Sequence, residues 1–251
     1  MYKALQKYFG YTSFYPLQED IINEALGQRD VFVLMPTGGG KSLCYQLPAL
    51  LLDGLTVVIS PLIALMKDQV DGLLADGIPA TFINSSLSYN EIEARRRSLS
   101  NKETKILYIA PERLVMPEFF EFLQGLKPSL FAVDESHCIS EWGHDFRPEY
   151  RQLKLLKEGF PKVPIMALTA TATPVVQEDI ITQLKLSDCK VFKASFNRKN
   201  LYYQIKPKAN PYHQLLQYLD VRKKDSGIIY CQSRKTVESL ASSLQTEGYR
   251  S

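Results

Sequence analysis

The chain has 251 residues, of which 45% are hydrophobic and 23% are charged, as is ordinary for a globular protein. Its 30 basic and 27 acidic side chains leave a net charge of +3, which neither requires nor excludes a nucleic-acid partner. No apolar run is long enough to span a bilayer, and the first residues lack the apolar core of a secretory signal. The four cysteines lie far apart without a C-x-x-C pair, which argues against a metal knuckle or a disulfide framework. We therefore expect an intracellular protein of a reducing compartment, cytoplasmic or nuclear, with no membrane partner.

Short apolar runs alternate with amphipathic stretches along most of the chain. The apolar runs predict buried strands at Val31–Met35, Thr56–Ser60, Ala80–Ile83, Lys105–Ile109, Leu130–Val133 and Ile165–Leu168. The amphipathic stretches predict helices at Leu17–Leu26, Ser42–Leu52, Leu62–Ala75, Tyr89–Leu99, Glu118–Gly125 and Arg147–Lys157. This alternation predicts an α/β fold with a mostly parallel sheet, helices on both faces, and ligands at the carboxyl ends of the strands.

The C-terminal part of the chain continues this alternation and then changes character. It predicts a helix at Pro174–Leu186, strands at Lys190–Lys193, Leu201–Ile205 and Gly227–Cys231, and helices at Tyr212–Lys223 and Ser233–Glu247. The polar segment Lys206–Pro211 carries two prolines, which is typical of a linker. We expect one domain over residues 1–206, followed over residues 207–251 by a linker and the start of a second α/β domain.

A glycine-rich segment follows the first predicted strand and opens a helix, which is the context of a phosphate-binding loop. Its glycines let backbone N–H groups converge on the β-phosphate of a nucleotide. Lys41 would neutralise the β- and γ-phosphates, and the Ser42 hydroxyl would ligate Mg²⁺. The general pattern begins with Gly where this chain has Met35, and a ligand-free turn is the alternative that the Lys-Ser pair disfavours. The candidate nucleotide-binding residues are Met35, Pro36, Thr37, Gly38, Gly39, Gly40, Lys41 and Ser42.

An acidic pair, Asp134 and Glu135, follows the strand predicted at Leu130–Val133. Asp134 would hold Mg²⁺, and Glu135 would orient and deprotonate the attacking water. The pair would also suit a helix N-terminus, where acids complement the helix dipole, but the upstream phosphate loop favours catalysis. Thr169 and Thr171 end a further strand and would either relay between sites or cap the helix that begins at a proline.

Several signatures together resemble the superfamily 2 helicases of the RecQ family. The most specific is Asp134–Tyr150, which looks like that family's acidic box running into its aromatic-rich loop. Further stretches resemble its adenine-reading segment, its two strand-contacting motifs and the opening motif of its second motor domain, at Phe9–Gln18, Ser60–Gln69, Tyr108–Leu114 and Gly227–Arg234. The resemblance implies a RecA-like P-loop domain followed by an incomplete second one.

The same resemblance implies roles for individual side chains. Gln18 would read the adenine edge, as a Gln amide can pair with N6 and N7 of adenine, and Tyr11 would stack near the base. Trp142, Phe146 and Arg147 would stack on and grip single-stranded bases, whereas a core position for both aromatic residues is the alternative. His137 would act at the catalytic site, and His137 and His144 would couple the nucleotide and DNA sites by hydrogen bonds rather than bind a metal.

Two positions depart from the family pattern. Tyr15 stands where the family commonly has Arg, so a polar contact near the nucleotide is absent or replaced. The acidic box reads D-E-S-H rather than D-E-A-H, with Ser136 in place of Ala, a small change that we expect the site to tolerate.

The resemblance implies an ATP-dependent DNA helicase that uses Mg²⁺, moves 3′ to 5′ and acts on single-stranded and partly duplex DNA. In the family the second motor domain supplies arginines that reach the γ-phosphate, at positions that would follow Ser251. We therefore expect this chain to bind nucleotide but to hydrolyse it poorly and not to unwind alone. An RNA helicase or double-stranded DNA translocase, a nucleotide-gated binding module without turnover, and a small-molecule P-loop enzyme remain alternatives. The oligomeric state does not follow from the sequence.

Overall fold

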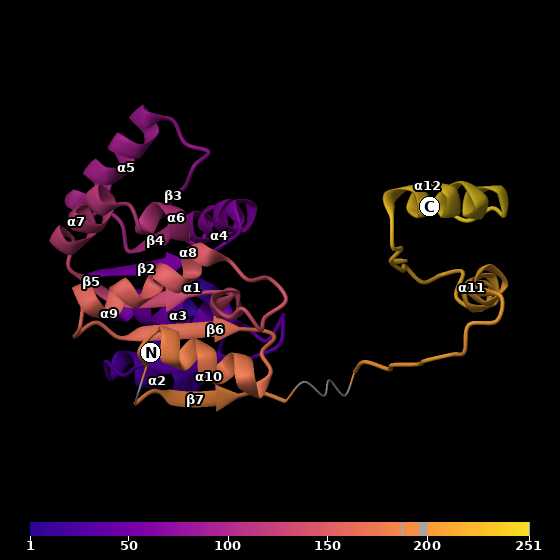
Figure 1. Ribbon diagram of the computed structural model, residues 1–251, viewed down its shortest axis with the longest axis horizontal. Coiled ribbons are helices and arrows are strands. Elements are labelled where there is room, and N and C mark those ends of the chain that lie inside the picture. The colour runs from indigo at the N-terminus through magenta and orange to yellow at the C-terminus, as the bar shows by residue number, and fades with distance from the viewer. Residues whose placement is uncertain (187, 196–199, 251) are drawn as a thin grey trace. The chain divides into compact units, whose positions relative to one another are not determined.

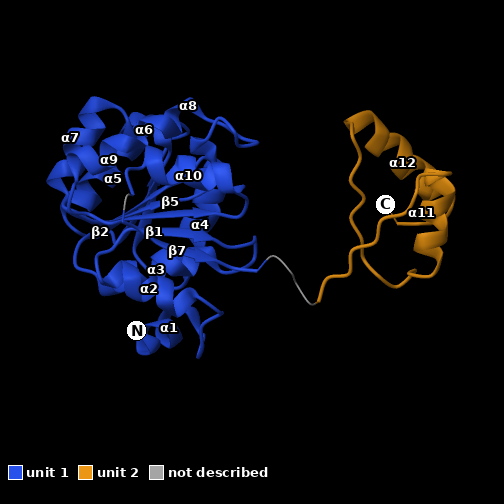
Figure 2. Ribbon diagram, turned by 60° about the horizontal axis from the view of Figure 1, so that its bottom comes forward, with its two compact units in different colours: residues 1–198 blue, residues 199–251 orange. Residues whose placement is uncertain are grey.

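A computed structural model describes residues 1–186, 188–195 and 200–250. The chain divides into two compact units, Met1–Arg198 and Lys199–Ser251, each of which is described by itself (Figure 2). The boundary expected between residues 206 and 207 falls inside the second unit. The identity of that unit as the start of a second motor domain stays a prediction.

The first unit is built on a seven-stranded sheet with the order β3-β4-β2-β5-β6-β1-β7 (Figure 1). Every pairing in it is parallel, so the predicted α/β fold is confirmed. The strands are β1 Val31–Leu34, β2 Leu55–Ile59, β3 Ala80–Ile83, β4 Ile106–Ile109, β5 Pro128–Val133, β6 Ile165–Thr169 and β7 Lys190–Lys193. Because all strands run the same way, the loops that follow them meet at one edge of the sheet.

Helices cover both faces of the sheet. They are α1 Tyr2–Phe9, α2 Gln18–Leu26, α3 Lys41–Leu51, α4 Ile63–Ala75, α5 Tyr89–Ser100, α6 Pro111–Leu114, α7 Pro117–Gly125, α8 Pro148–Arg151, α9 Leu155–Gly159 and α10 Pro174–Gln183. Two 3₁₀ turns, η1 Ser136–Ile139 and η2 Gln152–Lys154, flank α8.

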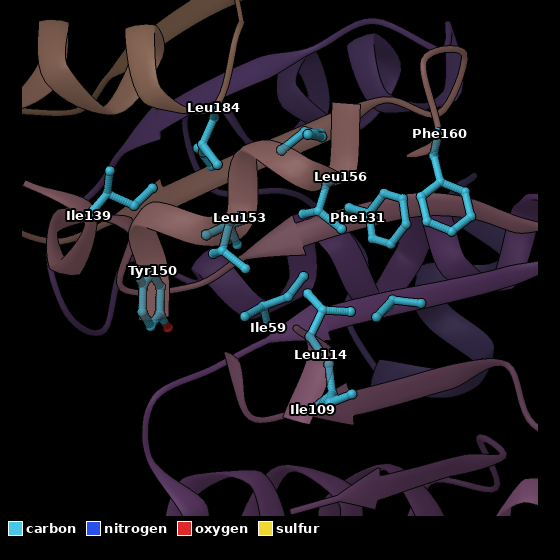
Figure 3. Close-up of a cluster of buried hydrophobic side chains, with 14 of the residues drawn as sticks. Ile59, Ile109, Leu114, Phe131, Ile139, Tyr150, Leu153, Leu156, Phe160 and Leu184 are labelled. Atoms are coloured by element: carbon cyan, nitrogen blue, oxygen red, sulfur yellow. The ribbon is translucent and has the colours of Figure 1, made fainter. Parts of the chain in front are cut away.

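The core has two layers because successive strand residues point to opposite faces. Phe32 and Leu34 of β1 belong to the layer that includes side chains of α7, α9 and α10, whereas Val31 and Val33 belong to the layer of α2, α3 and α4. Figure 3 shows part of the first layer, where Phe131 is fully buried beside Phe160. Burying such a ring contributes about 2 kcal/mol. These layers fix the sheet that carries the loops of the site.

Four expectations about secondary structure need correction. The helix predicted at Arg147–Lys157 is interrupted, because η2 separates α8 from α9. The helix α10 ends at Gln183 rather than at Leu186. Neither Leu201–Ile205 nor Gly227–Cys231 forms a strand. A strand needs a hydrogen-bonded neighbour, and none is present in the described part of the second unit, whose regular elements are α11 Pro211–Asp220 and α12 Arg234–Thr246.

Candidate active site

The phosphate loop connects β1 to α3, as the sequence predicted. Its first residue is tied to the sheet, because the Met35 amide donates to the Thr169 carbonyl at 3.1 Å. Gly40 has φ +80, a left-handed conformation that favours glycine. A Cβ atom at Gly40 would lie 2.3 Å from Gln18 Nε2, so a larger residue would displace the Gln18 side chain as well as adopt a strained φ. The loop is thus a close-packed cradle of backbone N–H groups at the start of α3.

Lys41 links the loop to the acidic pair. It is the first residue of α3, and its ammonium group donates to the Met35 carbonyl at 3.1 Å. For Asp134, burial raises the pKa and the Lys41 charge opposes this in part; for Glu135, the bond from His137 lowers the pKa and the Lys41 charge adds to this. The strand order places only β6 between β1 and β5, so the phosphate loop and the acidic pair share one site.

Asp134 directly follows β5, and its amide donates to the Ile59 carbonyl at 2.9 Å. Burial, followed by the neighbouring charge of Glu135, raises the pKa of the Asp134 carboxyl to about 6. The Tyr150 hydroxyl donates to the Asp134 carbonyl at 3.1 Å and holds the backbone in place. A bound cation would stabilise the ionised form of such a buried carboxyl beside a second acid.

Glu135 has φ 46 and ψ 43, a left-handed conformation that costs a non-glycine residue about 1–2 kcal/mol. A hydrogen bond with His137 is the main cause that lowers the pKa of Glu135. His137 Nδ1 lies 3.3 Å from Glu135 Oε2 and 2.9 Å from Thr169 Oγ1. A carboxylate only accepts hydrogen bonds, so this geometry favours the His137 tautomer with its proton on Nδ1. Glu135, His137 and Thr169 therefore form one network at the carboxyl ends of β5 and β6.

The Thr169 hydroxyl extends this network to the next segment. It lies 3.2 Å from both the carbonyl oxygen and the amide nitrogen of Thr171. The cap of α10, by contrast, is Thr173, whose hydroxyl accepts from the Val176 amide. The capping alternative thus does not apply to Thr169 and Thr171.

The aromatic-rich loop follows η1 and folds back on it. Gly143 permits this return, because a Cβ atom there would lie 2.8 Å from the His137 carbonyl. The rings of His137 and His144 stack with centroids 4.5 Å apart. Trp142 is 76% exposed and Phe146 is 37% exposed, so the core alternative does not hold for Trp142. The loop therefore joins an exposed aromatic surface to the His137 network.

Arg147 anchors the far end of this loop. Its guanidinium donates to the Pro61 carbonyl and to Asp145 Oδ2, both at 3.1 Å. Pro61 lies in the segment after β2 that resembles a strand-contacting motif, so Arg147 connects that segment to the aromatic-rich loop.

Three side chains able to ligate a metal, His137, Cys138 and Asp145, bring their donor atoms within 4.8 Å of one another. Each of these side chains already contacts another residue of the protein. His137 bonds Thr169, Asp145 pairs with Arg147, and Cys138 Sγ lies 3.7 Å from Asp145 Oδ2. These contacts explain why the three side chains lie close together.

A cavity of about 230 Å³ lies beside the phosphate loop, with Tyr11, Tyr15, Gln18, Ser42 and Gln46 among its lining residues. Gln18 Oε1 accepts from the Tyr15 amide at 2.7 Å, and Gln18 Nε2 donates to the Gly40 carbonyl at 3.0 Å. Gln18 keeps one further N–H and one lone pair for a ligand. Tyr15 supplies an exposed ring at the position where Arg is common in the RecQ family.

Sequence reasoning missed several residues that shape the site. Tyr150 was quoted only as the end of a motif, and Arg151 was not singled out. Gln46 was missed too, although a polar side chain four residues after Ser42 on an apolar helix is a signal. Asp145, which pairs with Arg147, was not predicted as a site residue either. Their roles depend on partners far away in the sequence.

The sequence profile of the DEAD/DEAH box helicases matches residues 15–180, the part of the chain that carries the phosphate loop, the acidic pair and the aromatic-rich loop. The chain belongs to the DEAD/DEAH box helicase family. None of the helices in the described part of this helicase domain has the length and apolar character needed to cross a membrane.

Curated relatives confirm the resemblance to RecQ helicases. The ATP-dependent DNA helicase RecQ of Haemophilus influenzae is 50% identical over 245 residues, which cover 98% of this chain and 40% of that protein. The protein of the same name from Bacillus subtilis is 44% identical over 248 residues, or 98% of this chain and 42% of that protein. The chain thus spans about two-fifths of the length of these relatives.

Solved helicase structures share the fold. The DUF1998 helicase MrfA matches with a TM-score of 0.71 at 19% sequence identity, over 98% of this chain and 40% of that chain. At this identity the likeness shows the fold alone. The first unit of this DEAD/DEAH box helicase is therefore a RecA-like domain.

Proposed function

We propose that the chain is the ATP-binding part of a DNA helicase motor that moves 3′ to 5′ along single-stranded DNA and unwinds duplexes. The observation that carries the proposal is that Thr169 contacts both motifs. Its carbonyl accepts from the Met35 amide of the phosphate loop, and its hydroxyl lies 2.9 Å from His137 Nδ1, which lies 3.3 Å from Glu135 Oε2. Hydrolysis of a bound triphosphate requires a phosphate loop and catalytic acids that are held together in this way. The RecQ relatives, which are named ATP-dependent DNA helicases, support the choice of substrates.

In this proposal ATP lies along the phosphate loop with its base in the adjoining cavity. Backbone N–H groups of Gly38, Gly39 and Gly40 donate to phosphate oxygens, together with the helix N-terminus that follows. Lys41 exchanges its bond to the Met35 carbonyl for the β- and γ-phosphates. The remaining loop residues, Pro36 and Thr37, shape the cradle. Gln18 reads the adenine edge, and Tyr11 stacks beside the base.

The donor set also fits Mg²⁺. A hydroxyl from Ser42 and a carboxylate from Asp134 are hard oxygen ligands of the kind that Mg²⁺ prefers. Burial, followed by the charge of Glu135, raises the pKa of Asp134, so a cation beside this carboxyl would favour its ionised form. When bound, Mg²⁺ would supply that positive charge and neutralise part of the charge on the phosphates.

Glu135 acts as the base that orients water and accepts its proton. The bond from His137 keeps this carboxyl ionised and holds it in one orientation, which suits an acceptor of protons. Thr169 fixes the His137 ring through Nδ1, and Thr171 extends the contact to the end of β6. His137 therefore connects Thr169 and Thr171 to Glu135.

The aromatic-rich loop binds single-stranded DNA. Trp142 and Phe146 offer aromatic faces that accept any base, and each stacked base contributes about 1–3 kcal/mol. Arg147 holds the loop against the segment after β2. His144, stacked on His137, carries the state of the loop toward Glu135. Partly duplex DNA is the corresponding substrate of the complete motor.

Hydrolysis by the 251 residues alone is proposed to be slow. Arginines that stabilise the transferred phosphoryl group are worth roughly 10³–10⁵ in rate. The resemblance assigns them to the second motor domain, and the chain spans only about two-fifths of the length of its RecQ relatives. The second unit would contribute the opening of that domain.

The decisive experiment is ATP hydrolysis by this chain with and without single-stranded DNA, with Lys41→Ala measured in parallel. We expect ATP to bind, turnover to be slow and insensitive to DNA, and binding to be lost in Lys41→Ala. Brisk DNA-stimulated turnover that Lys41→Ala abolishes would show that this lobe suffices for catalysis. Absence of ATP binding by the folded chain would overturn the proposal.

A second comparison tests the choice of nucleic acid. A protein that carries this chain together with a complete second motor domain should unwind a DNA duplex with a 3′ single-stranded tail faster than the equivalent RNA duplex. Equal or faster unwinding of RNA would favour the RNA helicase alternative. Nucleotide-dependent DNA affinity without turnover in that longer protein would favour a binding module.

A further inference from the structure

Four polar side chains form a cluster between α3, α4 and β4. They are Tyr45, Gln46, Gln69 and Tyr108. Gln46 Nε2 lies 3.1 Å from Gln69 Oε1 of α4 and 3.2 Å from the Tyr108 hydroxyl of β4. The hydroxyls of Tyr108 and Tyr45 lie 3.4 Å apart. Gln46, Tyr45 and Tyr108 are all buried, at 8%, 1% and 1% exposure. Burying so many polar groups costs free energy unless each is bonded, so the cluster has a specific arrangement.

One side of the cluster begins at the nucleotide site. Ser42, Tyr45 and Gln46 are spaced i, i+3 and i+4, so they share one face of α3. Ser42 and Gln46 also line the cavity beside the phosphate loop. A ligand in that cavity therefore meets the cluster directly.

The other side of the cluster ends in the segments that resemble strand-contacting motifs. Gln69 closes the Ser60–Gln69 segment, whose beginning is held by the bond from Arg147 to the Pro61 carbonyl. Tyr108 opens the Tyr108–Leu114 segment. Gln46 is thus bonded to both segments at once, although one follows β2 and the other begins within β4.

We propose that Gln46, Tyr108 and Gln69 form a positioning relay that couples nucleotide occupancy of the cavity to the placement of the two strand-contacting segments. The relay rests on the proposed function and adds a route that does not pass through the aromatic-rich loop. One amide nitrogen serves two acceptors on two elements, so a small shift of α3 changes both bonds together. Hydrogen bonds weaken steeply with misalignment, which makes the contact sensitive to such a shift.

The test measures linkage between two ligands on the intact chain. Affinity for a fluorescein-labelled oligothymidylate is determined by anisotropy with and without a non-hydrolysable Mg-ATP analogue, and the ratio of the two dissociation constants is the coupling. Tyr108→Phe, Gln46→Met and Gln69→Met each remove bonding groups with little change of shape. Gln183→Met is the matched control, because Gln183 Nε2 bonds Asp179 on α10, outside the relay.

We expect a ratio different from one in the unaltered chain and in Gln183→Met. In each relay variant the ratio should move toward one by about three- to tenfold, the size expected for one buried hydrogen bond. Affinity for the oligonucleotide alone is measured for each variant, so that the ratio separates coupling from any change in DNA binding itself. The double variant Gln46→Met/Tyr108→Phe should lose no more coupling than either single variant, because both break the same contact.

A merely structural role would lower the unfolding temperature and leave the ratio unchanged, and that result would overturn the relay. A ratio of one in the unaltered chain, with both ligands bound, would overturn it too. Failure of the folded chain to bind either ligand would instead sink the proposed function. Gln69 is only half-buried on α4, so Gln69→Met keeps the test open if a variant of the buried residues does not fold.

Discussion

Asp134 and Glu135 are neighbours whose carboxyl groups have pKa values displaced in opposite directions. Burial raises the pKa of Asp134, whereas the bond with His137 lowers that of Glu135. The difference suits two separate roles, in which Asp134 binds a cation and Glu135 stays ionised as a base. Both shifts arise from contacts that the two side chains make with the folded protein, so both change its stability with pH.

For Asp134 the sign follows from its raised pKa. Below about pH 4 the carboxyl is protonated in both states and contributes nothing, and as the pH rises through about 6 its ionisation penalises the folded state. In the absence of nucleotide and metal, Asp134→Asn should therefore raise the free energy of unfolding at pH 8 by up to about 3 kcal/mol.

Urea unfolding from pH 4 to 8 measures this difference, which should shrink toward zero at the acid end. Asp53→Asn, at an exposed acidic position, is the control and should show little change at any pH. A destabilised Asp134→Asn at pH 8 would contradict the argument.

At the scale of elements, Arg151 holds the aromatic-rich loop to the rest of the domain. Its Nε donates to the Ile139 carbonyl at 3.0 Å, and its Nη2 lies 3.4 Å from Glu141 and 3.6 Å from Asp179 of α10. Its guanidinium also lies over the Phe146 ring, 5.9 Å from the centroid. One side chain thus ties η1, α8 and α10 together beside the proposed DNA-binding surface.

Arg151→Met keeps the length of the side chain and removes its charge and its donors. Loss of these partly exposed contacts should lower the free energy of unfolding by about 1 kcal/mol. Because the loop must then be ordered on binding, affinity for a single-stranded oligonucleotide should fall about fivefold. Anisotropy titrations check this, with Arg29→Met at the exposed ion pair with Glu24 as the control. Unchanged DNA affinity in Arg151→Met would show that the loop is ordered without this clamp.

Local sequence patterns predicted most elements, because each strand and helix of the core is encoded by its own periodicity. The strand at Ala80–Ile83 has the predicted bounds, as does that at Lys190–Lys193. The helix α1 was not predicted, and its N-cap, Met1, offers no capping side chain that would have marked its start. The break between α8 and α9 also escaped, since a 3₁₀ turn leaves the apolar spacing nearly unchanged.

At the scale of the whole molecule, the order of the strands and the contacts between distant side chains could not be predicted from the sequence. β1 lies between β6 and β7, a placement set by crossover connections rather than by any pattern within the strand. The motifs did predict that Lys41 and Asp134 act together. They did not predict the contact of Gln46 with Gln69 and Tyr108, because the sequence does not indicate which residues a polar side chain on an apolar helix will contact. Motifs within one segment could therefore be recognised from the sequence, whereas contacts between distant segments could not.

The two compact units lead to a last prediction, about independent stability. Residues 200–210 are all exposed, and Leu244 is the single buried side chain among the described residues of the second unit. A chain that ends at residue 206 should therefore unfold within about 2 °C of the intact chain, since exposed residues contribute little to stability.

Differential scanning calorimetry of the two chains measures the midpoints. A chain that ends at residue 189 serves as the contrast, because it also lacks β7 and leaves β1 without its neighbour from Val31↔Lys190 to Leu34↔Lys193. Loss of that ladder should lower the midpoint by several degrees, at about 4–8 °C per kcal/mol for a small domain and less for a larger one. If ending the chain at residue 206 lowered the midpoint as much, the second unit would contribute to the stability of the first, and the boundary of the folded domain would lie beyond residue 206.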